Sequence, residues 1–524
     1  MPYKTLQNLK PRKYQQDIFE NCKDKSCLVI LPTGIGKTLI ALMLAIHTQK
    51  RNPGTKTLFL APTRPLAEQH LEYFKKNLPE LFADMTLFTG KINAQKRKQI
   101  WQTADIIFST PQCIGNDLKK NLYDLSEVSL LIEDECHRCL KNYAYTYIAE
   151  RYKEQANLPQ ILGLTASPGT DKETIKQVAI NLGIKSIELR TRESEDVKEY
   201  LQELEFEIIK LEFPEEFKKI SQPIKELYER KIQELKNRKL LFKPANKMTL
   251  LELQGNLMNS LRRGSKNFHI FGGITACTQA LKLTHLIELI ETQTLFTANN
   301  YIKSIFEQAR ENKSKAVKQI INRPEFNEAY IGITELITRK LEHPKLLQLK
   351  DLVETAIKEN PKTKIIVFSQ YRDTVLKISQ ELNKIPNIKA KIFVGQTKKG
   401  ETGSSQKEQQ QIMNEFRTGE INLIAATSIA EEGLDIPEVN SVIFYETIPS
   451  AIRSIQRRGR TARLMKGKLV ILITKDTLDE IFYYSSKAKE KRMHNAIEAV
   501  KQDLDDGKEL TLKEKKPEQK RLFE

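Results

Sequence analysis

Short apolar runs alternate with longer amphipathic stretches between Lys25 and about Leu189. Such runs are typical of buried β-strands, and amphipathic stretches of this length are typical of helices. Strands that alternate with helices form a parallel sheet covered by helices on both faces. The pattern therefore predicts a first α/β domain with strands at residues 27–31, 57–61, 106–109, 130–132 and 161–164.

The pattern changes between about Pro214 and Lys340, where charged segments carry apolar residues at helical spacing and no strand-like run occurs. Ile224 and Leu227 show this spacing, which places apolar side chains on one face of a helix. From His343 the strand and helix alternation returns. It predicts a second parallel sheet with strands at residues 365–368, 390–394, 423–426, 441–445 and 468–472.

These changes divide the chain into four parts and predict the α/β class, with two parallel-sheet domains and an all-helical insertion between them. A length of 524 residues agrees, because domains average roughly 150 residues. The last part is polar, rich in Lys and Glu and short of large apolar residues, so we expect a charged helix that fades into disorder. The expected boundaries are 1–205, 206–342, 343–485 and 486–524.

Charge adds a candidate partner. Lys and Arg outnumber Asp and Glu by 85 to 67, a formal net charge of +18. A surplus of this size most often indicates a polyanionic partner, and nucleic acid before a membrane surface. A solvated basic surface without a partner is the alternative.

No apolar run approaches the ~18 residues that would span a bilayer, and the first residues lack the apolar stretch of a signal peptide. We therefore expect no membrane partner and a cytoplasmic protein, nucleoid-associated in a prokaryote. Six cysteines are too sparse for a disulfide framework and are expected to be free thiols. The Cys136 and Cys139 pair is not expected to bind zinc, because tetrahedral zinc needs four ligands and no second pair exists.

A candidate phosphate-binding loop lies between an apolar strand and an apolar helix. Gly34 and Gly36 let the backbone fold so that N–H groups and the positive end of the next helix face phosphates. Lys37 would reach the outer phosphates of ATP, and Thr38 would hold Mg²⁺. Leu31 replaces the usual first glycine of such loops. The loop residues expected to bind nucleotide are Pro32, Thr33, Gly34, Ile35, Gly36, Lys37 and Thr38.

Two carboxylates follow the strand at residues 130–132. Asp134 and Glu135 are expected at the carboxyl edge of the sheet beside the phosphate loop, where ligands of parallel sheets bind. Asp134 can bind Mg²⁺ through water, and Glu135 can polarise the water that attacks the γ-phosphate. A solvent-facing acidic strand end is the alternative.

The second α/β unit has no phosphate loop but contains the basic segment Gln456-Arg-Arg-Gly-Arg-Thr-Ala-Arg463. In a two-domain motor such arginines reach across a cleft to the nucleotide, where an arginine finger contributes ~10³–10⁵ in rate. Arg460 and Arg463 are therefore candidate catalytic residues, together with Gln456. A basic helix face toward water is the alternative.

With these motifs the chain resembles a superfamily 2 helicase, and more closely the helicase module of the Hef and Fanconi-anaemia-group-M family. The resemblance covers most of residues 1–480 and implies two RecA-like domains. Phe393-Val-Gly-Gln396, Ser405-Gln-Lys-Glu-Gln409 and the helical insertion resemble this family in particular. The other matching blocks are Arg12-Lys-Tyr-Gln15, Ala61-Pro-Thr-Arg-Pro-Leu66, Ser109-Thr-Pro-Gln112, Leu164-Thr-Ala-Ser-Pro-Gly169, Phe368-Ser-Gln-Tyr-Arg-Asp-Thr374 and Ala426-Thr-Ser-Ile-Ala-Glu-Glu-Gly-Leu-Asp-Ile-Pro437.

The resemblance also implies roles that the residues alone do not assign. It implies that Gln15 reads the adenine of ATP, supported by Arg12 and Tyr14. Thr165 and Ser167 would couple ATP hydrolysis to strand binding, and His137 would contact the γ-phosphate network or the other motor domain. It further implies nucleic-acid contacts by Arg64, Thr110 and Thr427, and coupling to the ATP cleft by Gly433 and Asp435.

The insertion carries its own basic segment. Between Arg230 and Ile270 there are ten Lys or Arg against two Glu, and the segment includes Arg262 and Arg263. Such a stripe can neutralise phosphates with little sequence preference. A solvated helix face is the alternative, although insertions in the family help to recognise branched DNA.

Two features bear on partners. No nuclease domain fits after the second sheet, so the chain resembles either a helicase-only member or a truncated one, and a separate nuclease is a candidate partner. The segment Gln519-Lys-Arg-Leu-Phe-Glu524 faintly resembles a sliding-clamp-binding peptide with Gln519, Leu522 and Phe523 as anchors. A plain disordered end is the alternative.

The resemblance implies an ATP- and Mg²⁺-dependent DNA helicase or translocase that acts on stalled forks and four-way junctions in replication-fork repair, with 3′-to-5′ polarity. A duplex-RNA-dependent motor of the Dicer and RNA-sensor type shares the Asp-Glu-Cys-His box and a helical insertion. The blocks around Phe393 and Ser405 favour the DNA motor. An ATP-gated scaffold that only holds junctions is a third hypothesis, disfavoured because binding alone needs neither Glu135 nor the arginines.

Overall fold

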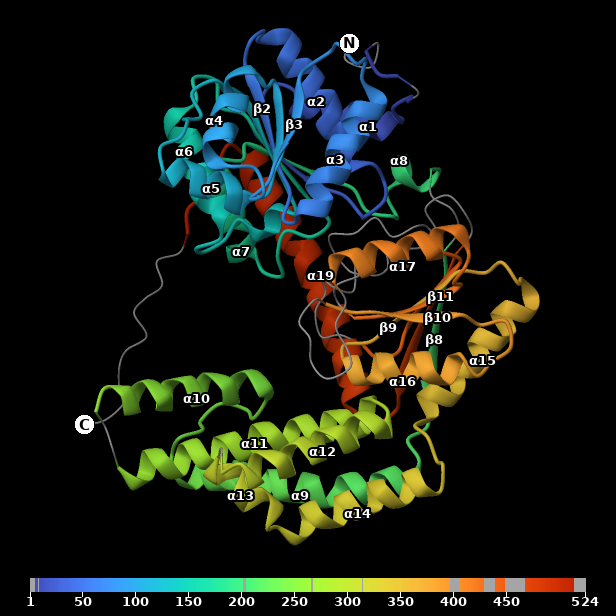
Figure 1. Cartoon of the computed structure of the whole chain (residues 1–524). Helices are drawn as coiled ribbons and strands as arrows, with labels where there is room; N and C mark the ends of the chain where they lie inside the picture. The colour runs from blue at the N-terminus through green and yellow to red at the C-terminus, as the bar shows by residue number, and fades with distance from the viewer. Residues whose placement is uncertain are drawn as a thin grey trace.

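The chain folds into two parallel β-sheets with a helical bundle between them in the sequence (Figure 1). The computed structural model describes residues 5–7, 9–200, 204–264, 267–312, 314–395, 405–427, 439–447 and 467–512. The expected α/β class, with two RecA-like sheets and a helical region between them, is confirmed. No helix in these ranges combines the length and the apolar character needed to cross a membrane.

The first sheet has the strand order β3-β4-β2-β5-β6-β1-β7, with every neighbouring pair parallel. Its central strands are buried throughout, as expected for a parallel sheet covered on both faces. The sequence analysis missed the two edge strands: β3 is only partly buried, and β7 carries Ser186 and Glu188 among its four residues. The strands are β1 (Cys27–Ile30), β2 (Lys56–Leu60), β3 (Met85–Phe88), β4 (Ile106–Ser109), β5 (Val128–Asp134), β6 (Ile161–Thr165) and β7 (Ser186–Leu189).

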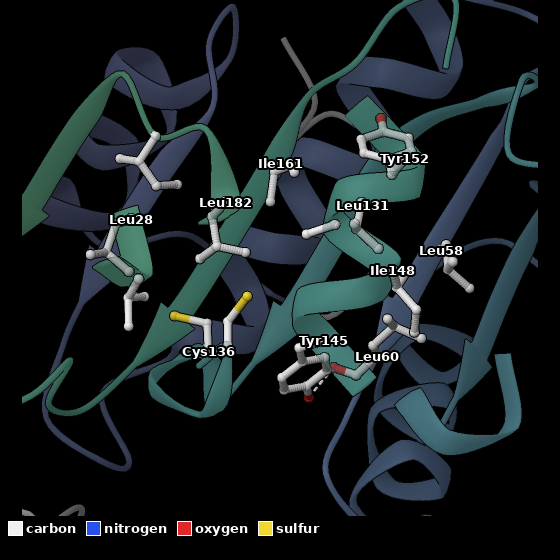
Figure 2. Close-up of a cluster of buried hydrophobic side chains, with 14 of the residues drawn as sticks. Leu28, Leu58, Leu60, Leu131, Cys136, Tyr145, Ile148, Tyr152, Ile161 and Leu182 are labelled. Atoms are coloured by element: carbon white, nitrogen blue, oxygen red, sulfur yellow. Dashed lines mark hydrogen bonds between the residues drawn. The ribbon is translucent and has the colours of Figure 1, made fainter. Parts of the chain in front are cut away.

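Helices cover both faces of this sheet and bury two separate apolar clusters. One cluster lies under α1, α2 and α3, and the other under α4 to α7. Figure 2 shows part of the second cluster, where strand residues such as Leu131 face Ile148 and Tyr152 of α6. The elements are α1 (Lys13–Cys22), α2 (Lys37–Arg51), α3 (Arg64–Asn77), α4 (Ala94–Thr103), α5 (Pro111–Lys119), η2 (Cys136–Arg138), α6 (Ala144–Gln155), α7 (Lys172–Leu182) and α8 (Glu195–Lys198).

The second sheet has the strand order β10-β11-β9-β12-β13-β8, again all parallel. Residues 206–211, assigned above to the insertion, instead belong to edge strand β8, which pairs with β13 from Leu204 to Leu211. The strand alternates charged and apolar residues and therefore lacks the continuous apolar run of a buried strand. The strands are β8 (Leu204–Leu211), β9 (Ile365–Phe368), β10 (Ala390–Phe393), β11 (Leu423–Ala426), β12 (Ser441–Phe444) and β13 (Gly467–Thr474).

The helices of this half either cover the second sheet or form the insertion. The insertion buries its own apolar core, which includes Ile224, Leu286, Ile302 and Ile333. The insertion helices are α9 (Glu215–Asn237), α10 (Lys247–Arg262), α11 (Phe268–Thr292), α12 (Leu295–Arg310), α13 (Lys315–Ile321) and α14 (Pro324–Thr338), and the others are α15 (Pro344–Glu359), α16 (Arg372–Leu382), α17 (Gln406–Thr418) and α19 (Leu478–Asp505).

Buried hydrogen bonds fix the insertion to the second sheet domain. Thr374 of α16 donates to Gln293 Oε1 at 2.8 Å, and its hydroxyl lies 2.9 Å from that of Thr297 on α12. The Tyr371 hydroxyl donates to Glu288 of α11 at 2.7 Å. Because β8 also precedes the insertion, the bundle both starts and ends at the second sheet. It is therefore an extension of the second domain rather than a free linker.

Helix α19 connects the second domain to the first (Figure 1). Its start contacts β13 and α11, and farther along the helix contacts α7 and β7 of the first domain. Met493, Ile497 and Val500 are buried in the cluster under α4 to α7. The sequence analysis expected a charged helix here, and these three residues at helical spacing form one apolar face of it. The helix therefore continues to Asp505.

The start of α19 is held by a fully buried ion pair. Lys345 Nζ of α15 lies 2.5 Å from Asp479 Oδ2, and neither side chain is exposed to solvent. The Lys345 ammonium also lies 5.0 Å from the centre of the Tyr445 ring. The pair therefore joins α15, α19 and the end of β12 within one desolvated contact.

We expect Lys345→Met to lower the free energy of unfolding by about 3–5 kcal/mol, because it leaves the buried Asp479 carboxylate without a counterion. Lys345→Met combined with Asp479→Leu should recover most of the loss. Urea unfolding followed by circular dichroism measures both changes. Lys358→Met, on an exposed lysine of the same helix, is the control. Equal small losses in the two single variants would contradict this account.

His343 is buried at the N-cap of α15 in its neutral form. Its Nε2–H donates to Glu291 O at 3.1 Å, and its Nδ1 accepts from Lys345 N at 3.3 Å. Burial, reinforced by the charge of Lys345, holds the pKa of His343 well below its usual range. In the unfolded chain His343 therefore takes up a proton near pH 6.5, whereas in the folded chain it stays neutral. The free energy of unfolding consequently falls as the pH drops below that value.

We expect His343→Asn to flatten the acid side of the stability profile. Asparagine keeps a cap acceptor for Lys345 N but has no titrating ring. Relative to the variant, the parent should lose about 1.4 kcal/mol per pH unit below pH 6.5. Urea unfolding of both proteins between pH 7.5 and 5 tests this, and parallel profiles would show that His343 does not titrate on unfolding.

Candidate nucleotide-binding site

The loop between β1 and α2 is held open by two glycines with positive φ. Gly34 and Gly36 both have φ of 88°, a conformation that strains residues with a side chain. A Cβ on Gly36 would also lie 2.2 Å from Gln15 Nε2. Gly36 is the N-cap of α2, so the loop delivers the free N–H groups of the first turn to the sheet edge.

Lys37 and Thr38 are the first two residues of α2. Lys37 Nζ donates to Leu31 O at 3.1 Å, which folds the lysine back over the loop. The Thr38 hydroxyl faces into the domain, 3.4 Å from His70 Nδ1. The other loop residues line the same turn: Ile35 is buried, and Pro32 and Thr33 are half-buried.

His70 links the phosphate loop to the acidic strand end. It lies buried on α3, with Nε2 3.0 Å from Asp134 Oδ2 and Nδ1 facing Thr38. Its ring packs on Phe59 with centroids 4.5 Å apart. The sequence analysis missed His70, although one signal was present: a histidine within the apolar stripe of α3.

Asp134 and Glu135 leave the end of β5 in different directions. Asp134 ends the strand, whereas Glu135 adopts the left-handed conformation with φ of 51° and turns the chain away. Burial alone would raise both pKa values, but hydrogen bonds from His70 and His137, with the charge of Lys37, hold the pKa of each carboxyl below its ordinary value. Both groups are therefore carboxylates at neutral pH.

Tyr145 fixes the backbone at this strand end. Its hydroxyl donates to Asp134 O at 2.6 Å. The same hydroxyl lies 3.2 Å from Leu60 O (Figure 2). The ring is fully buried in the cluster under α4 to α7. The neighbouring ends of β2 and β5 are therefore tied together from inside the domain, beneath the carboxylates.

A polar chain leads from Glu135 to the end of β6. His137 Nδ1 lies 3.3 Å from Glu135 Oε2 and 3.1 Å from Thr165 Oγ1. Thr165 Oγ1 in turn accepts from Ser167 N and donates to Ser167 O, each at 3.1 Å. The structure thus brings together the acidic residue and the three residues expected to act in coupling.

Helix α1 is attached to the loop through the residues expected near adenine. The Tyr14 hydroxyl donates to Ile35 O at 2.5 Å, and Gln15 Nε2 lies 3.4 Å from the same oxygen. Arg12 stacks its guanidinium over the Tyr200 ring at 5.1 Å. Tyr14 and Gln15 therefore border the loop, and Arg12 lies behind them on Tyr200, whose ring is 5.7 Å from that of Tyr14.

The residues expected to contact nucleic acid follow strand ends of both sheets. Arg64 begins α3 after β2, and Thr110 is the N-cap of α5 after β4. Thr427 follows β11 in the second sheet. Arg262 and Arg263 lie elsewhere, at the end of α10 in the insertion. Other expected residues, namely Gly433, Asp435, Gln456, Arg460, Arg463, Gln519, Leu522 and Phe523, lie outside the described residues.

The donor set of this site fits a nucleoside triphosphate with Mg²⁺. A helix N-terminus with a lysine beside it attracts phosphate oxygens. The hydroxyl of Thr38 and the carboxylate of Asp134 are oxygen ligands of the kind that Mg²⁺ takes, and His70 bridges the two through its ring nitrogens. Glu135 stands next to them as a carboxylate that could accept a proton.

Three protein-family profiles match the chain in succession. Residues 12–175 match "DEAD/DEAH box helicase", residues 216–343 match "Putative ATP-dependent RNA helicase, helical bundle", and residues 344–465 match "Helicase conserved C-terminal domain". The first covers the phosphate loop and the acidic strand end, and the third covers most of the second sheet. Fold and site together define a helicase of superfamily 2.

A crystal structure of the Hef helicase domain from Pyrococcus furiosus superposes with a TM-score of 0.69 at 42% identity, covering 91% of this chain and 98% of that one. "Putative ATP-dependent RNA helicase MJ1505" of Methanocaldococcus jannaschii is 38% identical over 93% of this chain and 61% of its own length. "ATP-dependent DNA helicase mph1" of Sclerotinia sclerotiorum is 32% identical over 93% and 41%. The chain belongs to the Hef and Fanconi-anaemia-group-M family. It spans less than two thirds of the length of these two curated relatives.

We expect His70→Ala to raise the Mg²⁺ concentration needed for half-maximal binding of a fluorescent ADP about tenfold or more, because outer partners of metal ligands contribute roughly 10- to 100-fold in affinity. His70→Gln should recover part of the effect. The control is His47→Ala, a half-buried histidine of α2 that packs on Phe19. An unchanged Mg²⁺ dependence in His70→Ala would show that the bridge does not position these ligands.

Proposed function

We propose that the protein is an ATP-dependent DNA helicase or translocase that remodels branched DNA during replication-fork repair. The observation that carries the proposal is the joint position of the phosphate loop, Asp134 and Glu135 at one edge of the first sheet. It occurs in a chain that is 42% identical to the Hef helicase domain. A second parallel sheet and an attached helical insertion supply the other parts of a two-domain motor.

ATP would bind at the edge formed by the phosphate loop. Lys37 would hold the outer phosphates, and Gln15 with Arg12 and Tyr14 would hold the adenine. Thr38 and Asp134 would hold Mg²⁺, which supplies charge neutralisation at the β- and γ-phosphates when bound. Glu135 would accept a proton from the attacking water, since its carboxylate is held in the charged form.

The second domain would supply the opposite wall of the ATP site. Arg460 and Arg463 would act as arginine fingers beside Gln456, and Gly433 with Asp435 would couple the cleft to strand binding. Closure of the cleft would place these groups against the phosphates. The series of polar contacts from Glu135 through His137 and Thr165 to Ser167 supports the coupling role proposed for these last three residues. It connects the Glu135 carboxylate, at the end of β5, to the end of β6.

DNA with a branch is the proposed substrate, and movement is proposed in the 3′-to-5′ direction. Arg64, Thr110 and Thr427 all follow the carboxyl ends of strands, and a strand lying across both sheets would meet them in turn. Relatives named as DNA helicases match more than nine tenths of the chain. The polarity comes from the family resemblance.

A duplex-RNA-dependent motor is the competing function, because one curated relative and one family profile carry RNA helicase in their names. The family blocks around Phe393 and Ser405 favour DNA. We further propose a separate nuclease as a partner, a sliding clamp that binds Gln519, Leu522 and Phe523, and a location in the cytoplasm or on the nucleoid.

We expect Lys37→Ala to lower DNA-stimulated ATP turnover at least 100-fold, because the lysine would hold the transferred phosphate, while junction binding changes less than twofold. Lys50→Ala, an exposed lysine of the same helix, should retain parental turnover. The measurement is steady-state ATPase with Mg²⁺ and a fluorescence binding assay on a four-way junction. Parental turnover in Lys37→Ala would refute the assigned site.

The same assay distinguishes the substrates. We expect stimulation by forks and junctions to exceed that by single-stranded DNA and duplex RNA at one fixed salt concentration. Stimulation by duplex RNA alone would replace the DNA proposal with the RNA motor. Junction binding without stimulated turnover would favour the scaffold hypothesis.

A further inference from the structure

The tip of the insertion carries an aromatic side chain held out into solvent. Phe268, the first residue of α11, is 97% exposed, and Phe271 on the next turn is 48% exposed. Residues three apart on a helix lie on the same side, so the two rings share one face. A single exposed apolar residue needs no explanation. The surroundings of this pair, however, set it apart.

The backbone beneath the rings is fixed on three sides. Asn267 caps α11 by accepting from Ile270 N at 2.8 Å. His269 Nε2 donates to Arg238 O at the end of α9, also at 2.8 Å. Gly273 lets the same region pack closely, since a Cβ there would lie 2.4 Å from the Leu240 side chain. Phe268 is therefore exposed on a rigid support, which spares a ligand the entropy of ordering it.

In the folded bundle, some cations of the basic segment form ion pairs and others do not. Five of its ten cations pair with carboxylates within the bundle. By contrast, Arg262 and Arg263 are exposed at the end of α10 and form no ion pair within the part of the chain that the structure describes. The paired cations are Arg230 with Glu325, Lys231 and Arg238 with Glu234, Lys243 with Glu252, and Lys247 with Glu288.

The unpaired arginines and the exposed rings lie at the same tip. Only five peptide steps separate Arg263 from Phe268, so their Cα atoms lie within about 18 Å of each other. A backbone phosphate and the base attached to its nucleotide need this combination of a cation and a flat apolar surface. A protein partner would suit the rings but would not require two uncompensated arginines.

We propose that Phe268, supported by Phe271, stacks on an unpaired base at a DNA branch while Arg262 and Arg263 neutralise the neighbouring phosphates. The inference rests on the proposed function and names the feature of the branch that the insertion recognises. Fully paired DNA keeps its bases stacked inside the helix and offers no face to the ring. An unpaired base next to a branch offers one.

The test uses the full chain and forked DNA that carries 2-aminopurine at an unpaired position beside the branch. Binding by the parent should quench the fluorescence of this base. We expect Phe268→Ala to remove the quenching and to weaken fork binding about 5- to 150-fold, the range for loss of one base–aromatic stack. Affinity for a blunt duplex of equal length should stay unchanged, and Phe268→Trp should keep the quenching.

Two control variants separate stacking from charge. Arg262→Ala with Arg263→Ala should weaken fork and duplex binding alike and reduce the salt slope by about 1.8, because each phosphate contact contributes about 0.9. Phe268→Ala should leave that slope unchanged. Leu81→Ala, on a first-domain side chain that is 99% exposed, should leave binding and quenching as in the parent.

Parental quenching and fork affinity in Phe268→Ala would overturn the inference even if forks stimulate ATP hydrolysis. Equal losses on fork and blunt duplex would overturn it as well, because the ring would then not read an unpaired base. If no DNA stimulates ATP turnover but Phe268→Ala still removes the quenching, the proposed motor function fails and the stacking site stands.

Discussion

Every strand of both sheets runs in the same direction as its neighbours, so the carboxyl ends of all strands in a sheet open on one edge. The chemistry of the first domain depends on this constraint. It brings Lys37, Asp134 and Thr165 together although they are about 130 residues apart in the sequence. Buried backbone hydrogen bonds and two apolar clusters hold the edge, and the polar residues at the strand ends need not stabilise the fold.

The insertion is attached to the second domain, whereas α19 connects the second domain to the first. The insertion is tied to the second domain through Glu288, Gln293 and Thr297, which hydrogen-bond to the residues around α16. A change in the position of the second domain therefore carries the tip with Phe268 along with it. Helix α19 leaves the same domain beside the Lys345–Asp479 pair and ends on the first domain. The two sheet domains are thus connected through α19.

The sequence predicted the central strands, the loop and the acidic strand end, because each depends on a local run of residues. It missed β3, β7 and β8, since an edge strand buries less surface and tolerates charged residues such as Glu205 and Glu207. His70 was missed for another reason: its role arises from Thr38 and Asp134, which only folding brings to it. The sequence also could not predict which cations of the basic segment form ion pairs, because Glu288 and Glu325 meet them only in the packed bundle.

The far end of α19 can be regarded as a ligand on a tether. The helix has 28 residues and is therefore about 42 Å long. The face with Met493, Ile497 and Val500 holds it to the first domain, together with the ion pairs of Lys172 and Lys176 to Asp503. A tethered contact forms within one molecule, so even a weak patch binds better than it would as a separate molecule. Releasing it would uncover this face and also the part of the first-domain apolar cluster that it covers. The contact between the two halves of the molecule at this end therefore depends on a few apolar side chains and on the ion pairs of Asp503.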